Sequence, residues 1–283
     1  MKRITAPVRI DLSGGWPDSD PYRRDYGGAV LNAAINLRVS ARFEEPNLIT
    51  SLEEVPSSSG LGTSGALRAA HLVASNNSLI QNPTSLIHKV HKFENEILEQ
   101  RAGFQDEAAA IYGGVNYWEF SPRGSITRIP LPEERVKYLE NKLVLVYTGE
   151  DHLSPNIHDN VFGEENYSRN IPRLHRMREI AHQMFREIDD PNTIPQLIRE
   201  TWELQRSLDS SIETDTMRIL QNELAGEYLA CRATGAGGGG CMIFYTETPE
   251  KLSRHVAVIS EKESLPNLKV IPFKFDYKGI LLE

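Results

Sequence analysis

Hydrophobic and polar residues alternate near the start of the chain. Over residues 6–12, three aliphatic side chains fall on one face of an extended segment, while Arg9 and Asp11 fall on the other. This alternation predicts a half-buried strand. Apolar runs bounded by glycine, proline or polar residues predict further extended segments, which are 29–39, a short stretch ending at Val55, 143–147, 241–246 and 270–277.

Apolar residues spaced three and four apart predict helices in the middle of the chain. Leu86, Val90, Phe93 and Ile97 mark an amphipathic helix over 84–100. Further helical segments are expected at 63–75, from Gln105 to the glycines at 113 and 114, and over most of 160–230, with breaks near 190–191 and 214–215. Because strands and helices are mixed rather than strictly alternating, we expect an α+β fold with two domains, 1–145 and 146–283, joined at a seam near 145–155.

Composition and charge narrow the class of protein. The chain has 283 residues, of which 40% are hydrophobic and 25% charged, and its net charge is -8. Binding to the phosphates of nucleic acid needs clustered lysine and arginine, so we expect no nucleic-acid partner. No apolar run approaches the roughly 20 residues of a membrane span, so we expect a cytoplasmic protein that binds no membrane. Cys231 and Cys241 lack metal-site spacing and are expected to be free thiols.

The segment from Pro56 to Ala66, with the sequence PSSSGLGTSGA, carries the clearest chemical signal. Glycines let backbone N–H groups turn inward, a helix start offers free N–H groups, and hydroxyl groups add donors or a metal ligand. We therefore expect the segment to bind phosphate through Pro56, Ser57, Ser58, Ser59, Gly60, Leu61, Gly62, Thr63, Ser64 and Gly65.

Other phosphate-binding chemistries fit the surroundings of this segment poorly. The glycines of 60–65 match the GxGxxG pattern of dinucleotide-binding proteins, but residues 66–93 contain no Asp or Glu to hold the ribose. A second match, at 235–240, precedes a strand rather than a helix. The lysine-containing Walker sequence and the HRD and DFG motifs of protein kinases are absent from the sequence. What remains is a phosphate-binding loop without a lysine, which needs Mg²⁺ and cations from elsewhere to offset the charge of a triphosphate.

Three separated segments resemble the motifs of the GHMP kinases, in the order of that family. They are Ala6–Asp18, Pro56–Ala66 and Ala233–Gly240. The Gly-Gly-Trp form of the first segment and the sequence Gly103-Phe-Gln-Asp106 are most similar to the branch of fucokinase and heptose-7-phosphate kinase, whose members phosphorylate an anomeric hydroxyl. The resemblance implies a two-domain α+β fold, with an N-terminal domain like domain 2 of ribosomal protein S5 and a ferredoxin-like C-terminal domain.

The resemblance also implies two catalytic residues. Asp106 matches the catalytic aspartate, and a carboxylate near a helix start is suited to orient and deprotonate a sugar hydroxyl. Arg9 matches the arginine of the first motif, whose fixed charge holds the aspartate ionised and steadies the transferred phosphoryl group. From the residues alone, Asp106 also fits a helix cap, and Arg9 a surface ion pair.

A magnesium site is implied by the same resemblance. Glu94 stands twelve residues before the catalytic aspartate, the family spacing for the metal-binding glutamate. Glu96 and Glu99 are its competitors. Ser64 is the expected hydroxyl ligand, with Thr63 as the alternative, since Mg²⁺ takes few protein oxygens besides phosphate and water.

Substrate contacts are expected from the first and third motifs. Asp18 matches a residue that binds sugar hydroxyls, and Asp11 is a weaker candidate that also fits a structural role. His152 is a further weak candidate for a substrate contact, although a histidine at such a position is more commonly exposed in a loop. The full set of expected substrate-binding residues is Gly15, Trp16, Asp18, Gly237 and Gly238.

The implied activity is transfer of the γ-phosphate of ATP, with Mg²⁺, to a hydroxyl of a sugar or sugar phosphate, with C1 favoured. The alternative is a ligand-binding or regulatory protein of the same fold with weak or no catalysis. The stretch 37–55 is shorter than in the family, so the residues around the nucleotide base stay unassigned. The identity of the sugar is left open, and a homodimer is one state that the sequence allows.

Overall fold

The computed structural model describes residues 2–44, 47–98, 101–151 and 154–283. The first sheet is antiparallel in the order β10-β1-β2-β4-β5, with β3 also paired to β2, and all its strands except β10 come from the first part of the chain. Its strands are β1 (Arg3–Ser13), β2 (Gly28–Glu44), β3 (Asn47–Ser51), β4 (Val115–Phe120), β5 (Ile126–Leu131) and β10 (Leu281–Leu282).

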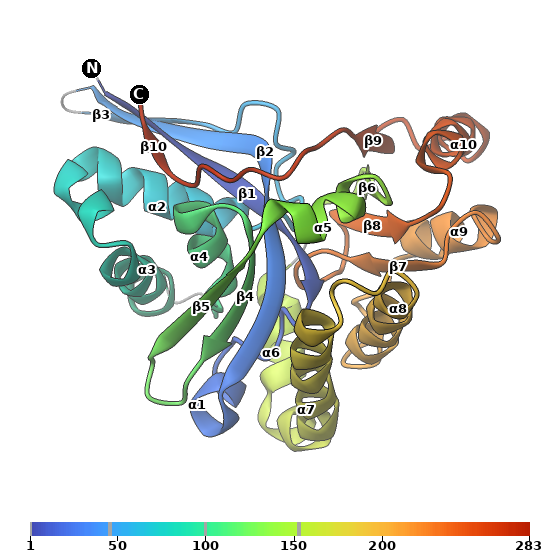
Figure 1. The fold of residues 1–283 in the computed structure, drawn as a ribbon, viewed down its shortest axis with the longest axis horizontal. Helices are drawn as coiled ribbons and strands as arrows, with labels where there is room; N and C mark the ends of the chain where they lie inside the picture. The colour runs from blue at the N-terminus through green and yellow to red at the C-terminus, as the bar shows by residue number, and fades with distance from the viewer. Residues whose placement is uncertain (1, 45–46, 99–100, 152–153) are drawn as a thin grey trace.

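Helices cover this sheet. α2 (Thr63–Ser75) and α4 (Gln105–Tyr112) pack on β1 and β2, and Figure 1 shows them on the same side as α3 (Pro83–Lys92). The small residues of α2 face the sheet, with Ala66, Ala69 and Ala70 fully buried, which lets the helix lie close to the strands. The predicted boundaries of 63–75 are confirmed, and so is the predicted start at Gln105.

The helix predicted over 84–100 ends earlier as an α-helix. After Lys92 the backbone widens into a π-helical turn, Phe93–Ile97, in which the N–H of Leu98 donates to the carbonyl of Phe93. Such single turns often occur at functional sites. The turn carries Glu94, whose side chain is buried.

A second antiparallel sheet has the order β7-β8-β6-β9. Its strands are β6 (Leu143–Tyr147), β7 (Ala230–Ala233), β8 (Cys241–Tyr245) and β9 (Lys269–Ile271). Numbered in chain order the strands lie 4-1-3-2, and helices join the first to the second and the third to the fourth, which is the ferredoxin-like βαββαβ arrangement. The α+β prediction is therefore confirmed. Figure 1 shows this sheet with α9 and α10 at one end of the molecule.

The remaining helices connect the strands. They are α1 (Tyr22–Tyr26), α5 (Glu133–Glu140), α6 (Ser154–Phe162), α7 (Glu164–Arg186), α8 (Thr193–Arg206), α9 (Asp215–Glu223) and α10 (Pro249–Lys262). The helical character of 160–230 and its breaks near 190–191 and 214–215 are confirmed. None of the helices in the described ranges is both long and apolar enough to cross a bilayer.

The last residues return from the second sheet to the first. The strand predicted over 270–277 is wrong beyond Ile271: β9 pairs with β6, and Phe275 then forms an isolated bridge with Ile35 in the first sheet. The alternation of apolar and polar residues over 270–277 therefore belongs to a segment that pairs first with β6 and then with β2. Leu281 and Leu282 add to the edge of β1, and one apolar core contains residues from both sheets. The division at 145 stays a prediction.

Candidate active site

A cavity of about 500 Å³ collects most of the predicted site residues. Its walls come from β1, the loop before α2, the first turns of α2, the π-helical turn, the start of α4, α6 and the segment after β7. The predicted residues that line it outside the phosphate-binding segment are Arg9, Gly15, Asp18, Glu94 and Asp106.

Arg9 and Asp106 form an ion pair in this cavity. Arg9 Nε and Nη2 lie 2.8 and 2.7 Å from Asp106 Oδ1, and Arg9 Nη1 donates to the carbonyl of Gly60 at 2.6 Å. The arginine side chain is 4% exposed and that of Asp106 30%. Burial lowers the pKa of Arg9, but the carboxylates of Asp106 and Asp11 outweigh it and raise the pKa above its ordinary value. The guanidinium therefore stays charged and holds the Asp106 carboxylate in place.

Ser64 and Glu94 form a second pair beside the first. The hydroxyl of Ser64, in the first turn of α2, donates to Glu94 Oε1 at 2.6 Å. Burial raises the pKa of Glu94 to about 7, the Ser64 hydrogen bond opposes this shift, and the charge of Asp106 adds to it. Glu96 is exposed and pairs with Lys92, so it does not compete for this place. Glu99 lies outside the described residues, as does His152.

Asp18 is fully buried at another wall of the cavity. Its Oδ2 accepts the backbone N–H of Gln105 at 3.0 Å, while Oδ1 has no hydrogen-bond partner among the described residues. Burial raises the pKa of Asp18 to about 6, against the effect of the Gln105 hydrogen bond. A buried carboxylate oxygen without a partner is suited to accept a hydrogen bond from a ligand hydroxyl.

The phosphate-binding segment supplies one side of the cavity. Its residues in contact with the cavity are Ser57, Ser58, Ser59, Gly60, Gly62, Thr63 and Ser64. Gly60 and Gly62 have φ of 70° and 72°, in the left-handed region, and a Cβ on Gly62 would lie 3.0 Å from Asp106 Cγ. These glycines let the segment approach the Arg9–Asp106 pair closely.

Three residues of the segment are placed elsewhere. Pro56, Leu61 and Gly65 do not line the cavity. Leu61 is buried in the core, and its carbonyl accepts the backbone N–H of Arg9. A Cβ on Gly65 would lie 2.7 Å from Asp106 Cβ, so this glycine lets α2 and α4 come together.

Three of the predicted substrate contacts are also placed elsewhere. Trp16 is fully buried, with its ring 4.8 Å from that of His158. A Cβ on Gly237 would meet Ile212, and one on Gly238 would meet Ile157. These glycines permit close packing of the loop, and in their place Gly235 and Ala236 line the cavity.

Asp11 joins the first and third motifs. Its Oδ2 accepts from Arg232 Nη2 at 2.8 Å, its Oδ1 accepts from the backbone N–H of Gly235 at 2.8 Å, and Asp11 and Arg232 are both fully buried. Gln205 adds a further contact to Arg232 at 3.0 Å. Asp11 thus has the structural role considered for it. Arg232 and Gln205 were not predicted, because a single arginine in an apolar strand carries no local signal for a partner 221 residues away.

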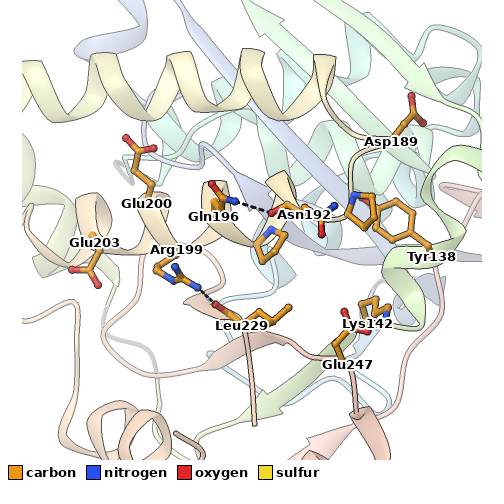
Figure 2. A pocket seen from close by; sticks show the side chains of 12 residues that line it. Tyr138, Lys142, Asp189, Asn192, Gln196, Arg199, Glu200, Glu203, Leu229 and Glu247 are labelled. Atoms are coloured by element: carbon orange, nitrogen blue, oxygen red, sulfur yellow. Dashed lines mark hydrogen bonds and ion pairs between the residues drawn. The ribbon is translucent and has the colours of Figure 1, made fainter. Parts of the chain in front are cut away.

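A wider groove of about 920 Å³ lies along α8. Figure 2 shows its walls, where Lys142 and Glu247 pair and the guanidinium of Arg199 donates to the carbonyl of Leu229. None of the predicted site residues lines it. We place the functional site in the smaller cavity, because only there do the predicted catalytic and metal-binding pairs lie side by side.

Comparisons with known proteins show relatives along nearly the whole chain. Residues 29–114 match the family model of the GHMP kinases N terminal domain. The chain is 24% identical to D-glycero-alpha-D-manno-heptose 7-phosphate kinase of Campylobacter jejuni, over 98% of this chain and 97% of that protein. It is 22% identical to the L-fucokinase/L-fucose-1-P guanylyltransferase of Bacteroides fragilis, over 97% of this chain but 37% of that longer protein.

Solved structures show the same fold. A D-glycero-D-manno-heptose 1-phosphate kinase from Bacteroides thetaiotaomicron superposes with a TM-score of 0.76 at 21% identity, covering 100% of this chain and 99% of that one. Lactococcus lactis galactokinase in complex with galactose gives a TM-score of 0.72 at 16% identity, covering 100% and 94%. Residues 29–114 therefore form a GHMP kinase N-terminal domain, and over nearly its whole length the chain is similar to GHMP kinases, phosphotransferases that use ATP and an alcohol group as acceptor.

Proposed function

We propose that this chain transfers the γ-phosphate of ATP to the anomeric C1 hydroxyl of a sugar or sugar phosphate, with Mg²⁺ bound by Ser64 and Glu94. The observation that carries the proposal is the Arg9–Asp106 ion pair, which lies in the same cavity as the hydrogen-bonded Ser64 and Glu94. The choice of a sugar acceptor is supported by the relatives, which are named as heptose kinases and fucokinases.

The residues present fit a magnesium-bound triphosphate. Ser64 and Glu94 offer two adjacent oxygens, and Mg²⁺ prefers one or two protein oxygens with phosphate and water completing its shell. Gly60 and Gly62, both at left-handed φ, carry no Cβ where the loop meets the cavity, and the start of α2 supplies unpaired N–H groups. Bound there, Mg·ATP supplies the phosphoryl group for transfer.

Asp106 is the general base in this proposal. Both Arg9 contacts fall on Oδ1, and Oδ2 has no hydrogen-bond partner among the described residues, so it is free to accept the proton of the acceptor hydroxyl. Arg9 fixes the carboxylate and brings a permanent positive charge close to the place where negative charge develops.

Asp18 orients the acceptor. Its partnerless Oδ1 accepts a hydrogen bond from a sugar hydroxyl, and the N–H of Gln105 at the start of α4 holds its other oxygen. Since α4 carries both Gln105 and Asp106, the same helix end positions the residue that binds the sugar and the base. This arrangement brings the acceptor hydroxyl to the base in a fixed orientation.

A screen for ADP release tests the proposal. Fucose, galactose, mannose, heptose and their phosphates are offered with Mg·ATP, and phosphorus NMR of the product identifies the phosphorylated position. Asp106→Asn should lower kcat by roughly 10²–10⁴-fold with little change in ATP affinity. Asp189→Asn, which removes an exposed carboxylate paired with Arg135, is the control and should leave kcat unchanged. Full activity of Asp106→Asn on the true acceptor, or the absence of ADP with every sugar, would contradict the proposal.

A further inference from the structure

Arg68 lines the cavity without an ionic partner among the described residues. Its Nε is buried and has no hydrogen-bond partner, and its guanidinium carbon lies 5.9 Å from the centre of the Phe93 ring. The two other arginines of the cavity are engaged. Arg9 is held by Asp106, and Arg101 pairs with Asp159 at 3.2 Å. Arg68 is thus the cavity arginine whose charge the protein leaves available.

The position of Arg68 on α2 directs it toward the phosphate-binding segment. It stands four residues after Ser64, so the two residues lie on the same face of the helix, one turn apart. Helical side chains lean toward the N-terminus, and a long arginine therefore reaches back over the preceding turn. Consistent with this direction, Ser64, Arg68 and Glu94 all line the same cavity.

A nucleoside triphosphate bound in the cavity needs such a positive charge. The segment 56–65 contains no lysine or arginine, and a nucleoside triphosphate carries several negative charges that one Mg²⁺ only partly offsets. The charge of Arg9 is already shared between Asp106 and Asp11. The loop, the metal pair and Arg9 therefore leave negative charge on the donor unbalanced.

We propose that Arg68 binds the donor nucleotide through the phosphates beyond the first, and so supplies the cation that the phosphate-binding segment lacks. The inference rests on the proposed function, since it takes the donor to be a nucleoside triphosphate. Guanidinium binds phosphate oxygens through two parallel N–H groups, which lysine cannot reproduce. The contrasting explanation is a structural one, in which Arg68 only packs against Phe93.

Calorimetric titration separates these explanations. The purified chain and its variants are titrated with ATP, ADP and AMP, each in the presence of Mg²⁺ and again in EDTA. Arg68→Met keeps the aliphatic stem and removes the charge. This variant should weaken ATP and ADP binding by roughly 10- to 100-fold and leave AMP binding within about twofold of the parent. The loss of ATP and ADP affinity should be larger in EDTA than in the presence of Mg²⁺. Arg68→Lys should fall between the parent and Arg68→Met. Lys92→Met, which removes an exposed cation paired with Glu96 near the same site, should bind all three nucleotides as the parent does.

A second test uses NMR on the parent protein, so its result does not depend on a substitution that lowers stability. The Nε–Hε resonance of Arg68 in the parent protein, assigned by its loss in Arg68→Lys, should shift on addition of ADP and stay in place on addition of AMP. Equal weakening of all three nucleotides, unchanged ATP affinity in Arg68→Met, or an unmoved Arg68 resonance would overturn the inference while leaving the kinase proposal standing. Failure of the parent chain to bind ATP would overturn both.

Discussion

The buried Asp11–Arg232 pair allows a quantitative test of how the two sheets are held around the cavity. Arg232→Met removes the guanidinium that lies 2.8 Å from Asp11 Oδ2 and leaves a fully buried carboxylate with two remaining partners, the N–H of Gly235 and, at 3.8 Å, Arg9 Nη1. Removing one partner of a buried ion pair costs about 3–5 kcal/mol, because the other charge stays buried and uncompensated. Since Gly235 still donates to Asp11, we expect the lower end of that range, about 3 kcal/mol.

Urea unfolding at pH 7, followed by tryptophan fluorescence and circular dichroism, measures this loss. Asp11→Asn with Arg232→Met removes both charges and should recover about 2 kcal/mol relative to the sum of the single changes. Arg176→Met is the matched control, because its pair with Glu200 is of similar length, at 2.6 Å, but is 38% and 41% exposed. It should cost at most about 1 kcal/mol. A loss below about 1 kcal/mol for Arg232→Met, or strictly additive losses in the double variant, would refute the reasoning.

Three further outcomes are expected. Burial raises the pKa of Asp18 from an ordinary value near 4 to about 6, so ionisation of this carboxyl opposes folding as pH rises through this window. Relative to the parent, Asp18→Asn should therefore gain about 2–3 kcal/mol of stability between pH 4 and pH 7. Urea unfolding at both pH values measures this gain, and a stability difference that does not depend on pH would contradict the prediction. Gly62→Ala places a Cβ 3.0 Å from Asp106 Cγ at a left-handed φ. This change should lower the free energy of unfolding by about 1–2 kcal/mol and lower kcat at least roughly tenfold. Gly124→Ala is the control: its φ is 88° and no atom lies within 4 Å of the new Cβ, so it should lower stability without lowering kcat. Glu94→Gln should raise the Mg²⁺ concentration for half-maximal activity by roughly tenfold or more, and an unchanged Mg²⁺ dependence would remove Glu94 from the metal site.

The sequence predicted the elements whose signals are local. The helix over 63–75 follows a glycine-rich loop, and the helix at Gln105 ends at paired glycines, so both boundaries agree with the structure. The hairpin of β4 and β5 was missed, although Ser121-Pro-Arg-Gly-Ser125 between two apolar stretches is a turn signal. β7 was missed because a four-residue strand is too short to show a period.

Site residues that depend on distant packing could not be read from local patterns. Trp16 follows two glycines of the first motif, yet its ring is fully buried against His158, and it is His158 that lines the cavity. The roles of Gly237 and Gly238 depend on Ile212, in the turn between α8 and α9, and on Ile157 of α6. Such contacts arise only when the whole chain is folded.

The glycines at the cavity explain why residues from distant segments act together. A Cβ on Gly60 would lie 2.6 Å from the carbonyl oxygen of Thr234, one on Gly235 would lie 2.7 Å from that of Gly60, and one on Gly240 would lie 2.6 Å from that of Ser59. The phosphate-binding segment and the third motif are therefore in direct backbone contact, at a separation that any larger residue would increase. The same segment carries the carbonyl that accepts from Arg9 and the hydroxyl that donates to Glu94, so moving it outward would separate the Arg9–Asp106 pair from the Ser64–Glu94 pair. The glycines thus determine the distance between the Arg9–Asp106 pair and the Ser64–Glu94 pair, for which we propose the catalytic and the metal-binding roles.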